Sequence, residues 1–551
     1  MKAYLLKAIS AVLCLSLLVC AVGCGKPQET VSQNSTVQEV STEVVSSNVS
    51  ETNNAIAGSG GGARPSVTSA FAFYEGGKPT IVWRNLVEKE GHTAKVVIKD
   101  LNGKTVFEES GIRTNTYVLK KELTNRQQYK LYVYYFNEQG KDLGLMGGIY
   151  EDGLSVTYYK KAANASKYYF DGGITLDALN HYLNRAFAFT QALTDGEYEV
   201  AKESIKVTGA KYIQRAGCMW VTQLWEYNTS DRIKRNVAEI HSFDPEIIFE
   251  ACIFECVGKV VNDIPIPAYV FEAFGLPVEK RNFDFEKMTF ATGRNQWGED
   301  TGTPDITTLE AQMWFYHRAV FYIDMGFEAL HLGQVGLIGK TDTNYACFTK
   351  VVKMIRDYAY KNARRHYVII NGHQVNQKFI GTDGIMLADF NAFPARFNVA
   401  KGETDHKATE DNPQKCQIYP GTGDAVYQLG IVGTSTSGWY CTKYPYLAEI
   451  DNYSLQKDKL NLASAQIWGY DEITWYAYQP QWYRRQFFEE LTKQIDAFNE
   501  NGHLSAPGRR PVGTFVGSNG SYFYYAASKE GNPNYYGDLE FYRDLWNKLG
   551  K

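Results

Sequence analysis

Apolar and polar residues alternate along residues 66–161 with the two-residue period of half-buried β-strands. The clearest runs are residues 80–83, 94–98 and 129–135, and turn signals such as Asn102-Gly103 separate them. Many short strands joined by turns predict a small β-sandwich over this part of the chain. Its expected role is that of a spacer or scaffold for the domain that follows.

From about residue 166 the period changes, and short apolar runs alternate with stretches that repeat every 3.6 residues. The expected helices cover residues 230–242, 309–325 and 344–365. The second of these begins at a capping box formed by Thr307 and Glu310 and ends near Gly326. Strands that alternate with helices predict a parallel α/β domain.

Eight apolar runs of strand length predict a (β/α)8 barrel over residues 162–505, followed by a C-terminal extension, residues 506–551, that packs on it. The runs are residues 168–172, 211–215, 247–255, 328–334, 367–373, 385–391, 446–451 and 473–478. In an alternative choice of the eight barrel strands, which we call the alternative frame, residues 521–525 form a strand with a helix at 538–548, and residues 168–172 lie outside the barrel. An open doubly wound sheet is the competing fold, but no Gly-rich dinucleotide-binding loop follows an early strand.

The first 23 residues have the layout of a secretory signal, with Lys2 and Lys7 before an apolar run at residues 8–22. This run is too short to span a bilayer comfortably, because a spanning helix needs about 20 apolar residues. The small residues before Cys24 resemble the lipobox of bacterial lipoproteins. The resemblance implies that Cys24 is acylated and anchors the chain to the outer surface of the cell membrane. An ordinary cleaved signal is the alternative.

Residues 24–65 are rich in Ser, Thr, Asn, Gln and Glu and contain no aromatic residue. Such a segment cannot bury enough apolar surface to fold, so we expect a flexible tether. The chain has a net charge of -4, and loss of Lys2 and Lys7 with the signal would bring it to -6. Because no basic run occurs outside the signal, nucleic acid is not an expected partner.

Six cysteines lie outside the signal region, and none forms the CxxC pair that is typical of zinc ribbons. We predict no metal site and no cofactor. We expect most of these cysteines to be buried as small apolar side chains. Aromatic residues make up 14% of the chain. This content suits a protein that stacks sugars on aromatic rings, and it equally suits ordinary packing.

Polar residues close most of the predicted barrel strands, at the end where barrel enzymes carry their active sites. Several converging carboxylates without a metal motif suit glycosidic bond cleavage, in which one acid protonates the leaving oxygen and another carboxylate attacks the sugar or activates water. The catalytic candidates are Glu255 and Glu449, with Asp389 and Asp451 as substitutes. The candidates for substrate binding are His331, Gln334, Asn371, His373, Arg215, Trp220, Trp439 and Trp475.

Each candidate also has a structural interpretation. A strand-end acid can pair with Arg215 or Arg396, a lone histidine is more often structural than catalytic, and a tryptophan is more often part of the core. The group is therefore a stronger indication than any single member.

Residues 173–176, 251–255, 264–267 and 332–335 resemble segments of large exported barrel proteins of glycan-degrading bacteria, which are similar to glycoside hydrolases. Residues 66–161 resemble an immunoglobulin or fibronectin type III module. The resemblance of the barrel segments to glycoside hydrolases implies a glycosidase that acts on a carbohydrate. The best-known retaining barrels close the fourth strand with Asn-Glu, whereas here the fourth predicted strand ends in His331 and Gln334.

Two other functions remain open. The barrel could be a non-catalytic glycan receptor, because a fold does not guarantee chemistry. It could also be a metal-dependent hydrolase with His331, His373, Asp389 and Glu255 as ligands, although no HExxH motif occurs.

Overall fold

The structure is a computed structural model that describes residues 65–73, 79–87, 89–125, 127–147, 149, 151–158, 166–194, 196–217, 225–374, 379–400, 403, 407–413, 416–418, 434–439, 443–451, 470–513 and 523–551. The predicted signal peptide, Cys24 and residues 24–64 of the predicted tether lie outside the described residues, as does Trp220. Within the described ranges, no helix combines the length and apolar character needed to cross a membrane.

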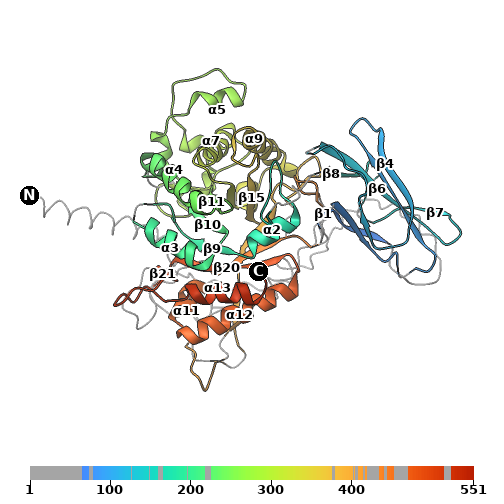
Figure 1. The fold of residues 1–551 in the computed structure, drawn as a ribbon. Coiled ribbons are helices and arrows are strands. Elements are labelled where there is room, and N and C mark those ends of the chain that lie inside the picture. The colour runs from blue at the N-terminus through green and yellow to red at the C-terminus, as the bar shows by residue number, and fades with distance from the viewer. Residues whose placement is uncertain are drawn as a thin grey trace, which may run out of the picture.

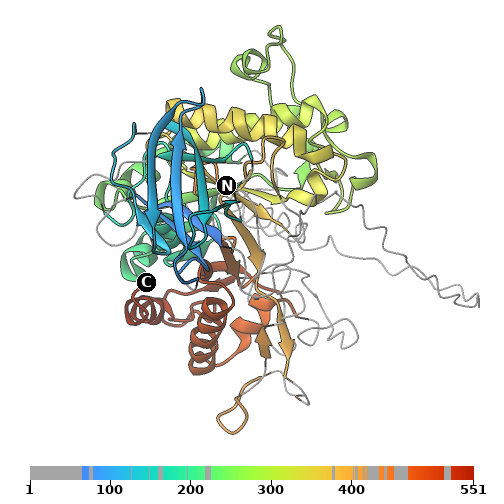
Figure 2. The same ribbon diagram turned by 90° about the vertical axis from the view of Figure 1, so that its right-hand side faces the viewer.

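Two antiparallel sheets face each other in the N-terminal domain, which confirms the predicted sandwich (Figures 1 and 2). One sheet has the order β1-β2-β5, and the other has the order β4-β3-β6-β7 with β8 also paired to β6. Alternate residues of β6 are buried, because one face of this strand packs on the core around Trp83. The strands are β1 (Ser66–Phe73), β2 (Pro79–Arg84), β3 (Thr93–Lys99), β4 (Thr105–Ile112), β5 (Thr116–Val118), β6 (Gln127–Phe136), β7 (Asp142–Leu145) and β8 (Leu154–Tyr158).

Eight parallel strands form a closed ring in the second domain (Figure 1). Each strand pairs with the next, and the last strand pairs in parallel with the first. This closure confirms the predicted (β/α)8 barrel. In ring order the strands are β9 (Ala186–Phe189), β10 (Tyr212–Gly217), β11 (Ile248–Cys252), β14 (Ala329–Gln334), β15 (Ile369–His373), β16 (Phe390–Pro394), β19 (Tyr446–Glu449) and β20 (Gly502–Pro511).

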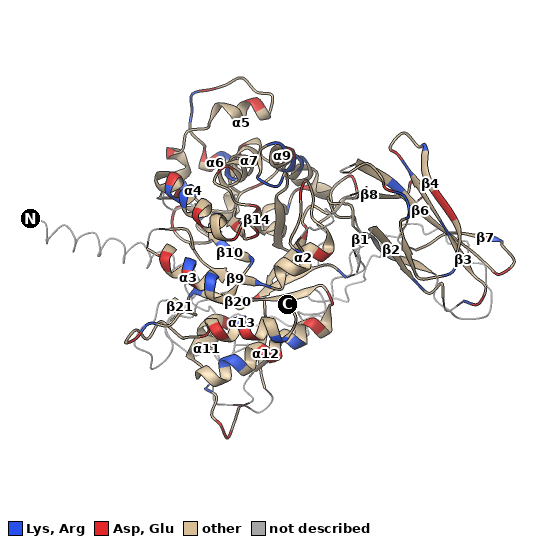
Figure 3. Cartoon of the chain, viewed as in Figure 1, with Lys and Arg blue, Asp and Glu red and all other residues tan. Residues whose placement is uncertain are grey.

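Helices surround the barrel, and Figure 3 shows acidic and basic positions mixed along α3 and α12. The helices are α2 (Leu176–Leu183), α3 (Tyr198–Thr208), α4 (Trp225–Phe243), α5 (Ala268–Ala273), α6 (Phe285–Met288), α7 (Leu309–Asp324), α8 (Val335–Ile338), α9 (Ala346–Asn362), α11 (Glu472–Tyr478), α12 (Gln481–Phe498) and α13 (Leu539–Lys548). Short additional strands are β12 (Val257–Gly258), β13 (Thr301–Gly302), β17 (Phe397–Val399), β18 (Cys416–Ile418) and β21 (Phe523–Tyr525), and 3₁₀ turns are η1 (Lys259–Asp263), η2 (Ala291–Gly293) and η3 (Thr343–Tyr345).

The N-terminal end of the barrel is filled by an apolar plug. Residues from the segment before β9 and from α2 pack under the first inward-facing residue of the strands. Tyr168, Phe170 and Tyr182 belong to this cluster together with Ile248 and Ile369. The plug closes one end of the barrel, so a ligand can approach only the other end.

The predicted number of eight barrel strands was right, but two of the predicted strands were wrong. Residues 168–172 form part of the plug, because their alternating apolar residues pack under the ring without pairing to a strand. Residues 473–478 belong to helix α11. The prediction failed because a fully buried apolar run shows neither the helical nor the strand period. The strand predicted at 385–391 lies a few residues later, as β16.

The two true strands that sequence reasoning missed are β9 and β20. β9 is only four residues long, and β20 contains Gly, Pro and two Arg residues, a composition that is typical of loops. β20 runs across the boundary that the sequence placed between residues 505 and 506. β21 and α13 occur where the alternative frame expected a strand and a helix, but β21 pairs antiparallel to β20 and is not a barrel strand.

The three predicted helices are present as α4, α7 and α9. The N-cap of α7 is Thr308, whose hydroxyl accepts a hydrogen bond from the N–H of Ala311 at 3.2 Å. The predicted box used Thr307, one residue earlier. Glu310 does not close a box, because its carboxylate binds Arg281 instead.

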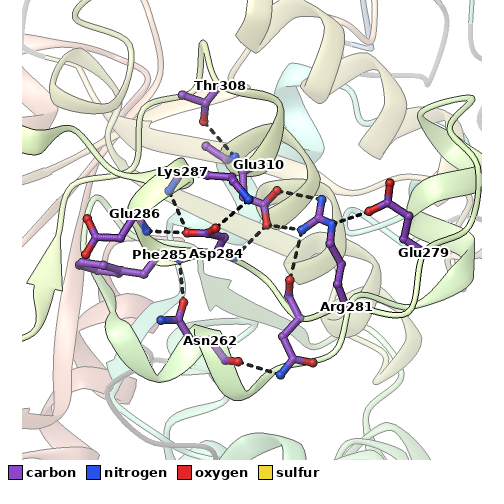
Figure 4. Close-up of polar contacts among 11 residues, drawn as sticks. Asn262, Glu279, Arg281, Asp284, Phe285, Glu286, Lys287, Thr308 and Glu310 are labelled. Atoms are coloured by element: carbon purple, nitrogen blue, oxygen red, sulfur yellow. Dashed lines mark hydrogen bonds and ion pairs between the residues drawn. The ribbon is translucent and has the colours of Figure 1, made fainter.

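An insertion between β11 and α7 is fastened by the buried carboxylate of Glu310 (Figure 4). Arg281 donates to both of its oxygens at 2.8 and 3.0 Å, and the N–H of Asp284 donates at 2.9 Å. Arg281 also pairs with Glu279, whose side chain is 59% exposed, against 5% for Glu310. The two acids therefore bind the same guanidinium in very different surroundings.

We expect Glu310→Ala to lower the free energy of unfolding by about 2 kcal/mol, because it removes the buried acceptor shared by the guanidinium of Arg281 and the N–H of Asp284. Glu279→Ala removes an exposed partner of the same arginine, so its effect should stay below about 0.5 kcal/mol. Urea unfolding followed by tryptophan fluorescence measures both. Equal losses in the two variants would contradict the anchoring role of Glu310.

Candidate functional site

The C-terminal half of the barrel interior is polar. Asn371 of β15 donates to Glu250 of β11, which is two strands away in the ring, and Arg215 of β10 reaches Glu449 of β19, which is three strands away. Contacts between strands that are not neighbours have to pass through the interior. This half of the barrel therefore holds charged and amide side chains in place of the usual branched apolar layers.

Glu250 is the centre of one buried network. Its carboxylate accepts from the hydroxyl of Tyr212 at 2.7 Å, from Nδ2 of Asn371 at 2.8 Å and from the backbone N–H of Arg215 at 3.1 Å. Because Asn371 donates through Nδ2, its Oδ1 is the acceptor for Nδ1 of His331, at 2.7 Å. The network thus assigns the ring hydrogen of His331 to Nδ1 and leaves Nε2 as an acceptor.

Two neutral histidines lie next to each other above this network. Their ring centroids are 4.8 Å apart. Burial lowers the pKa of His331 to about 4, and the neighbouring His373 adds to the effect. Burial also lowers the pKa of His373 to about 4, with a contribution from Arg215. Both rings are therefore uncharged at neutral pH.

Glu449 is fully buried between two guanidinium groups. Arg215 donates to it through Nε at 2.8 Å and through Nη2, and Nη1 of Arg510 lies 3.4 Å away. Arg510 and Arg215 also contact Asp451, two residues further along the chain. Burial alone would raise the pKa of Glu449, but the two arginines outweigh it and hold the pKa well below the usual range. Glu449 is therefore ionised.

Arg215 adopts a left-handed backbone conformation, with φ of 60°. Residues with a Cβ rarely take this conformation, because it costs about 1–2 kcal/mol. It turns the N–H of Arg215 toward Glu250 while the side chain reaches Glu449. Strained backbone of this kind is often found at functional sites.

Asp471 and Glu472 are buried acids at the same end of the barrel, and sequence reasoning missed both. Burial raises the pKa of Asp471 to about 8, although Thr474 donates to it at 2.7 Å. Burial raises the pKa of Glu472 to about 7, although Arg396 donates to it at 2.8 Å. The signal was present in the sequence as Asp471 followed by an acid in the first helical turn, with Thr at the third helical position, which is typical of an N-cap.

Four carboxyl groups and three guanidiniums form this second cluster. The acids are Glu449, Asp451, Asp471 and Glu472, and the arginines are Arg215, Arg396 and Arg510. One carboxyl has no compensating cation, so it retains its proton most easily. Asp471 is that group, since it is the acid of the cluster with the highest pKa.

Glu255 lies against the C-terminal end of β14. It accepts from the N–H of Gln334 at 3.1 Å and from Nε2 of the same residue at 2.9 Å. Its carboxylate occupies the space above Gly333, where an added Cβ would come within 2.1 Å of Oε2. β15 and β16 separate β14 from β19 in the ring, so Glu255 and Glu449 face the mouth from different sides.

The structure brings most of the predicted site residues together at the mouth. They are Arg215, Glu255, His331, Gln334, Asn371, His373, Glu449 and Asp451. Asp389 does not join them. It precedes β16, at the opposite end of the strand, and accepts from Arg356 at 3.0 Å, from Tyr367 at 2.6 Å and from the N–H of Ile370 at 2.8 Å. These contacts make Asp389 a structural ion-pair partner.

The two described tryptophans of the prediction belong to the core and offer no face to the mouth. Trp439 packs in the apolar plug, and its Nε1 donates to the carbonyl of Ile174 at 3.0 Å. Trp475 is completely buried and packs edge-on against Phe397 and Phe487. Their bulk fills the interior, which is the commoner use of this residue type.

Within the described part of the chain, many of the buried polar atoms that lack a hydrogen-bond partner gather at this mouth. They are Oε1 of Gln214, Nε2 of His331, Nε2 of His373, Oε1 of Gln374, Oδ2 of Asp471, Oε2 of Glu472 and Oγ of Ser505. A buried polar atom without a partner is costly, so such a cluster indicates a place where water or a ligand binds. The described residues contain no group of three His, Cys, Asp or Glu side chains arranged to hold a metal ion.

Comparison with known proteins gives similarity only at the level of structure. No family model matches the chain, and no curated protein matches it in sequence. The chain is similar to the apo β-glucuronidase of Ruminococcus gnavus, with 11% identity and a TM-score of 0.32 over 88% of this chain and 68% of that one. It is also similar to a Lactobacillus rhamnosus β-glucuronidase, with 10% identity and a TM-score of 0.29 over the same shares. Because these scores are low, the fold assignment rests on the strand pairings.

We expect Gly333→Ala to lower the free energy of unfolding by about 3 kcal/mol or more. The added Cβ combines an unfavourable positive φ with a collision against Glu255. Gly275→Ala is the matched control, because Gly275 has a similar φ of 68° and nothing within 4 Å of the added atom. Its loss should stay near 1–2 kcal/mol in chemical denaturation. A loss in Gly333→Ala no larger than in the control would show that Glu255 does not occupy this position.

Proposed function

We propose that the chain is a glycoside hydrolase anchored by a lipid on Cys24 to the outer surface of the cell membrane. The observation that carries the proposed activity is the pairing of protonation states at the mouth of the barrel, where Glu449 is ionised and Asp471 keeps its proton. Hydrolysis of a glycosidic bond needs both forms, one to donate a proton and one to act as nucleophile or base.

In this mechanism Glu449 attacks the anomeric carbon or activates a water molecule. Arg215 and Arg510 fix its orientation and its charge. The proton goes to the leaving oxygen from one of two carboxyls. Asp471 is supported by its pKa of about 8, and Glu255 is supported by its position across the mouth from Glu449. The variants described below separate these two donors.

The remaining polar atoms of the mouth would bind the sugar. Nε2 of His331, Nε2 of His373 and Oγ of Ser505 have no partner among the described residues. Sugar hydroxyls donate and accept hydrogen bonds, so they can pair with atoms of this kind. The substrate class is therefore a poly- or oligosaccharide, and the apolar plug limits it to the open end of the barrel.

The full chain carrying Cys24→Ser should release reducing ends from at least one member of a panel of plant, algal and host glycans. Glu449→Gln should lower kcat/KM by about a thousandfold or more, because it removes the ionised group. Asp471→Asn should lower it by about 10²–10⁴-fold and abolish the fall in activity above about pH 8, where Asp471 loses its proton.

If the donor is Glu255, Glu255→Gln will show the large loss and Asp471→Asn will keep the alkaline limb of the profile. Asp389→Asn is the control, because this buried and ion-paired acid lies at the other end of the barrel. Sugar binding without hydrolysis of any glycan would replace the hydrolase with a glycan receptor.

The lipid anchor predicts that the chain incorporates radiolabelled palmitate and sediments with membranes. Cys24→Ser should abolish the label and release the protein into the soluble fraction. Cys20→Ser is the control and should change neither, since Val19 before Cys20 is bulkier than Gly23 before Cys24. Unaltered labelling of Cys24→Ser would refute the anchor.

A further inference from the structure

We infer that the sugar bound in the barrel mouth is uncharged, and that the site discriminates against sugars that carry a carboxylate. This inference rests on the proposed hydrolase activity and names the substrate class of the same site. Three features of the described residues support it, namely the occupied guanidiniums, the excess of acids, and the acceptor character of three atoms that lack a partner.

The first feature is that the arginines of the mouth are already bound to acids of the protein. Arg215 binds Glu449 at 2.8 Å and Asp451 at 3.6 Å. Arg510 binds Asp451 and lies 3.4 Å from Glu449. A carboxylate on a sugar is normally recognised by a bidentate guanidinium. To bind one here, an arginine would have to leave a buried internal partner.

Arg396 is the third guanidinium at this end of the barrel, and it too is engaged. Its Nη1 donates to Oε1 of Glu472 at 2.8 Å, and both side chains are at most 10% exposed. Separation of this pair would leave a buried charge on each side, which is strongly unfavourable. Each described arginine of the mouth is therefore bound to an acid of the protein, and none of them is left for an anionic ligand.

The second feature is the balance of charge. Six acidic side chains of the described residues lie at this end of the barrel, and three described guanidiniums face them. The acids are Glu250, Glu255, Glu449, Asp451, Asp471 and Glu472. If Asp471 and Glu472 are left out, because burial raises the pKa of each, four carboxyl groups remain beside three guanidiniums among the described residues. The two histidines are neutral and cannot make up the difference. A further carboxylate would thus meet net repulsion in a buried setting.

The third feature is the kind of hydrogen bond that the unoccupied atoms can make. Nε2 of His331 is an acceptor, because Asn371 holds the ring hydrogen on Nδ1. Oε1 of Gln214 and Oε1 of Gln374 are also acceptors without a partner among the described residues. A sugar hydroxyl can donate to such atoms, whereas a carboxylate has no hydrogen to give. Hydroxyl groups can therefore satisfy these three acceptors, which a carboxylate would leave without a partner.

The test uses pairs of 4-nitrophenyl glycosides that differ only at carbon 6, as CH₂OH or COO⁻. Glucoside and glucuronide form one pair, and galactoside and galacturonide form another, each as both anomers. In any pair that is hydrolysed, kcat/KM of the uncharged member should exceed that of the uronide by about 100-fold or more. Equal or faster hydrolysis of the uronide would overturn the inference while it supported the proposed hydrolase.

Binding of the methyl glycosides of the same sugars is measured by calorimetry, so the inference is tested even when no pair is hydrolysed. Tighter binding of the uncharged member supports it, and tighter binding of the uronide overturns it. Absence of hydrolysis in every pair and on every glycan would count against the proposed activity alone.

A variant tests the physical cause. Asp451→Asn removes one acid and releases Arg510 and Arg215 from it, so the preference for the uncharged sugar should fall by about tenfold. Asp389→Asn removes an equally buried, arginine-paired acid at the other end of the barrel and should leave the preference unchanged. The ratio of two rates from one preparation does not depend on the folded fraction. An unchanged ratio in Asp451→Asn would refute the charge-based explanation.

Discussion

The site depends on Arg215, which joins the two buried polar networks of the barrel. Its backbone N–H donates to Glu250, and its guanidinium holds Glu449 and contacts Asp451. It makes both contacts with a positive φ, a conformation that most residues with a side chain avoid. The strain is local, whereas the contacts of Arg215 reach strands β11 and β19 and hold Glu250 and Glu449 in place.

The barrel separates stability and chemistry along its axis. At the N-terminal end, an apolar plug packs under the strands and adds to the burial that stabilises the fold. At the other end, polar side chains replace the apolar layers and several of their atoms have no partner among the described residues. An arrangement of this kind is costly for stability and is therefore expected where a ligand completes the interactions.

The sequence predicted the architecture and much of the site for identifiable reasons. The site residues Glu449, His331 and Asn371 could be predicted, because each follows apolar residues of a strand. This pattern can be recognised even when the limits of the strand are wrong by a few residues. β20 could not be recognised, because its Gly, Pro and Arg residues are tolerated only through pairing on both sides. Asp471 was missed because the residues that follow it were predicted as a strand and form helix α11. Asp389 was assigned to the wrong end of the barrel because its strand was predicted a few residues too early.

The closure of the ring has a consequence for how the protein is made. β9 and β20 are neighbours in the barrel, yet they lie more than 300 residues apart in the chain. The barrel cannot close until nearly all of the polypeptide has been delivered, and contacts between such distant segments form slowly. Until then β9 and β19 present open strand edges, which favour association with other chains. Biogenesis of this fold therefore demands that the nascent chain be kept apart from its copies until its last strand arrives.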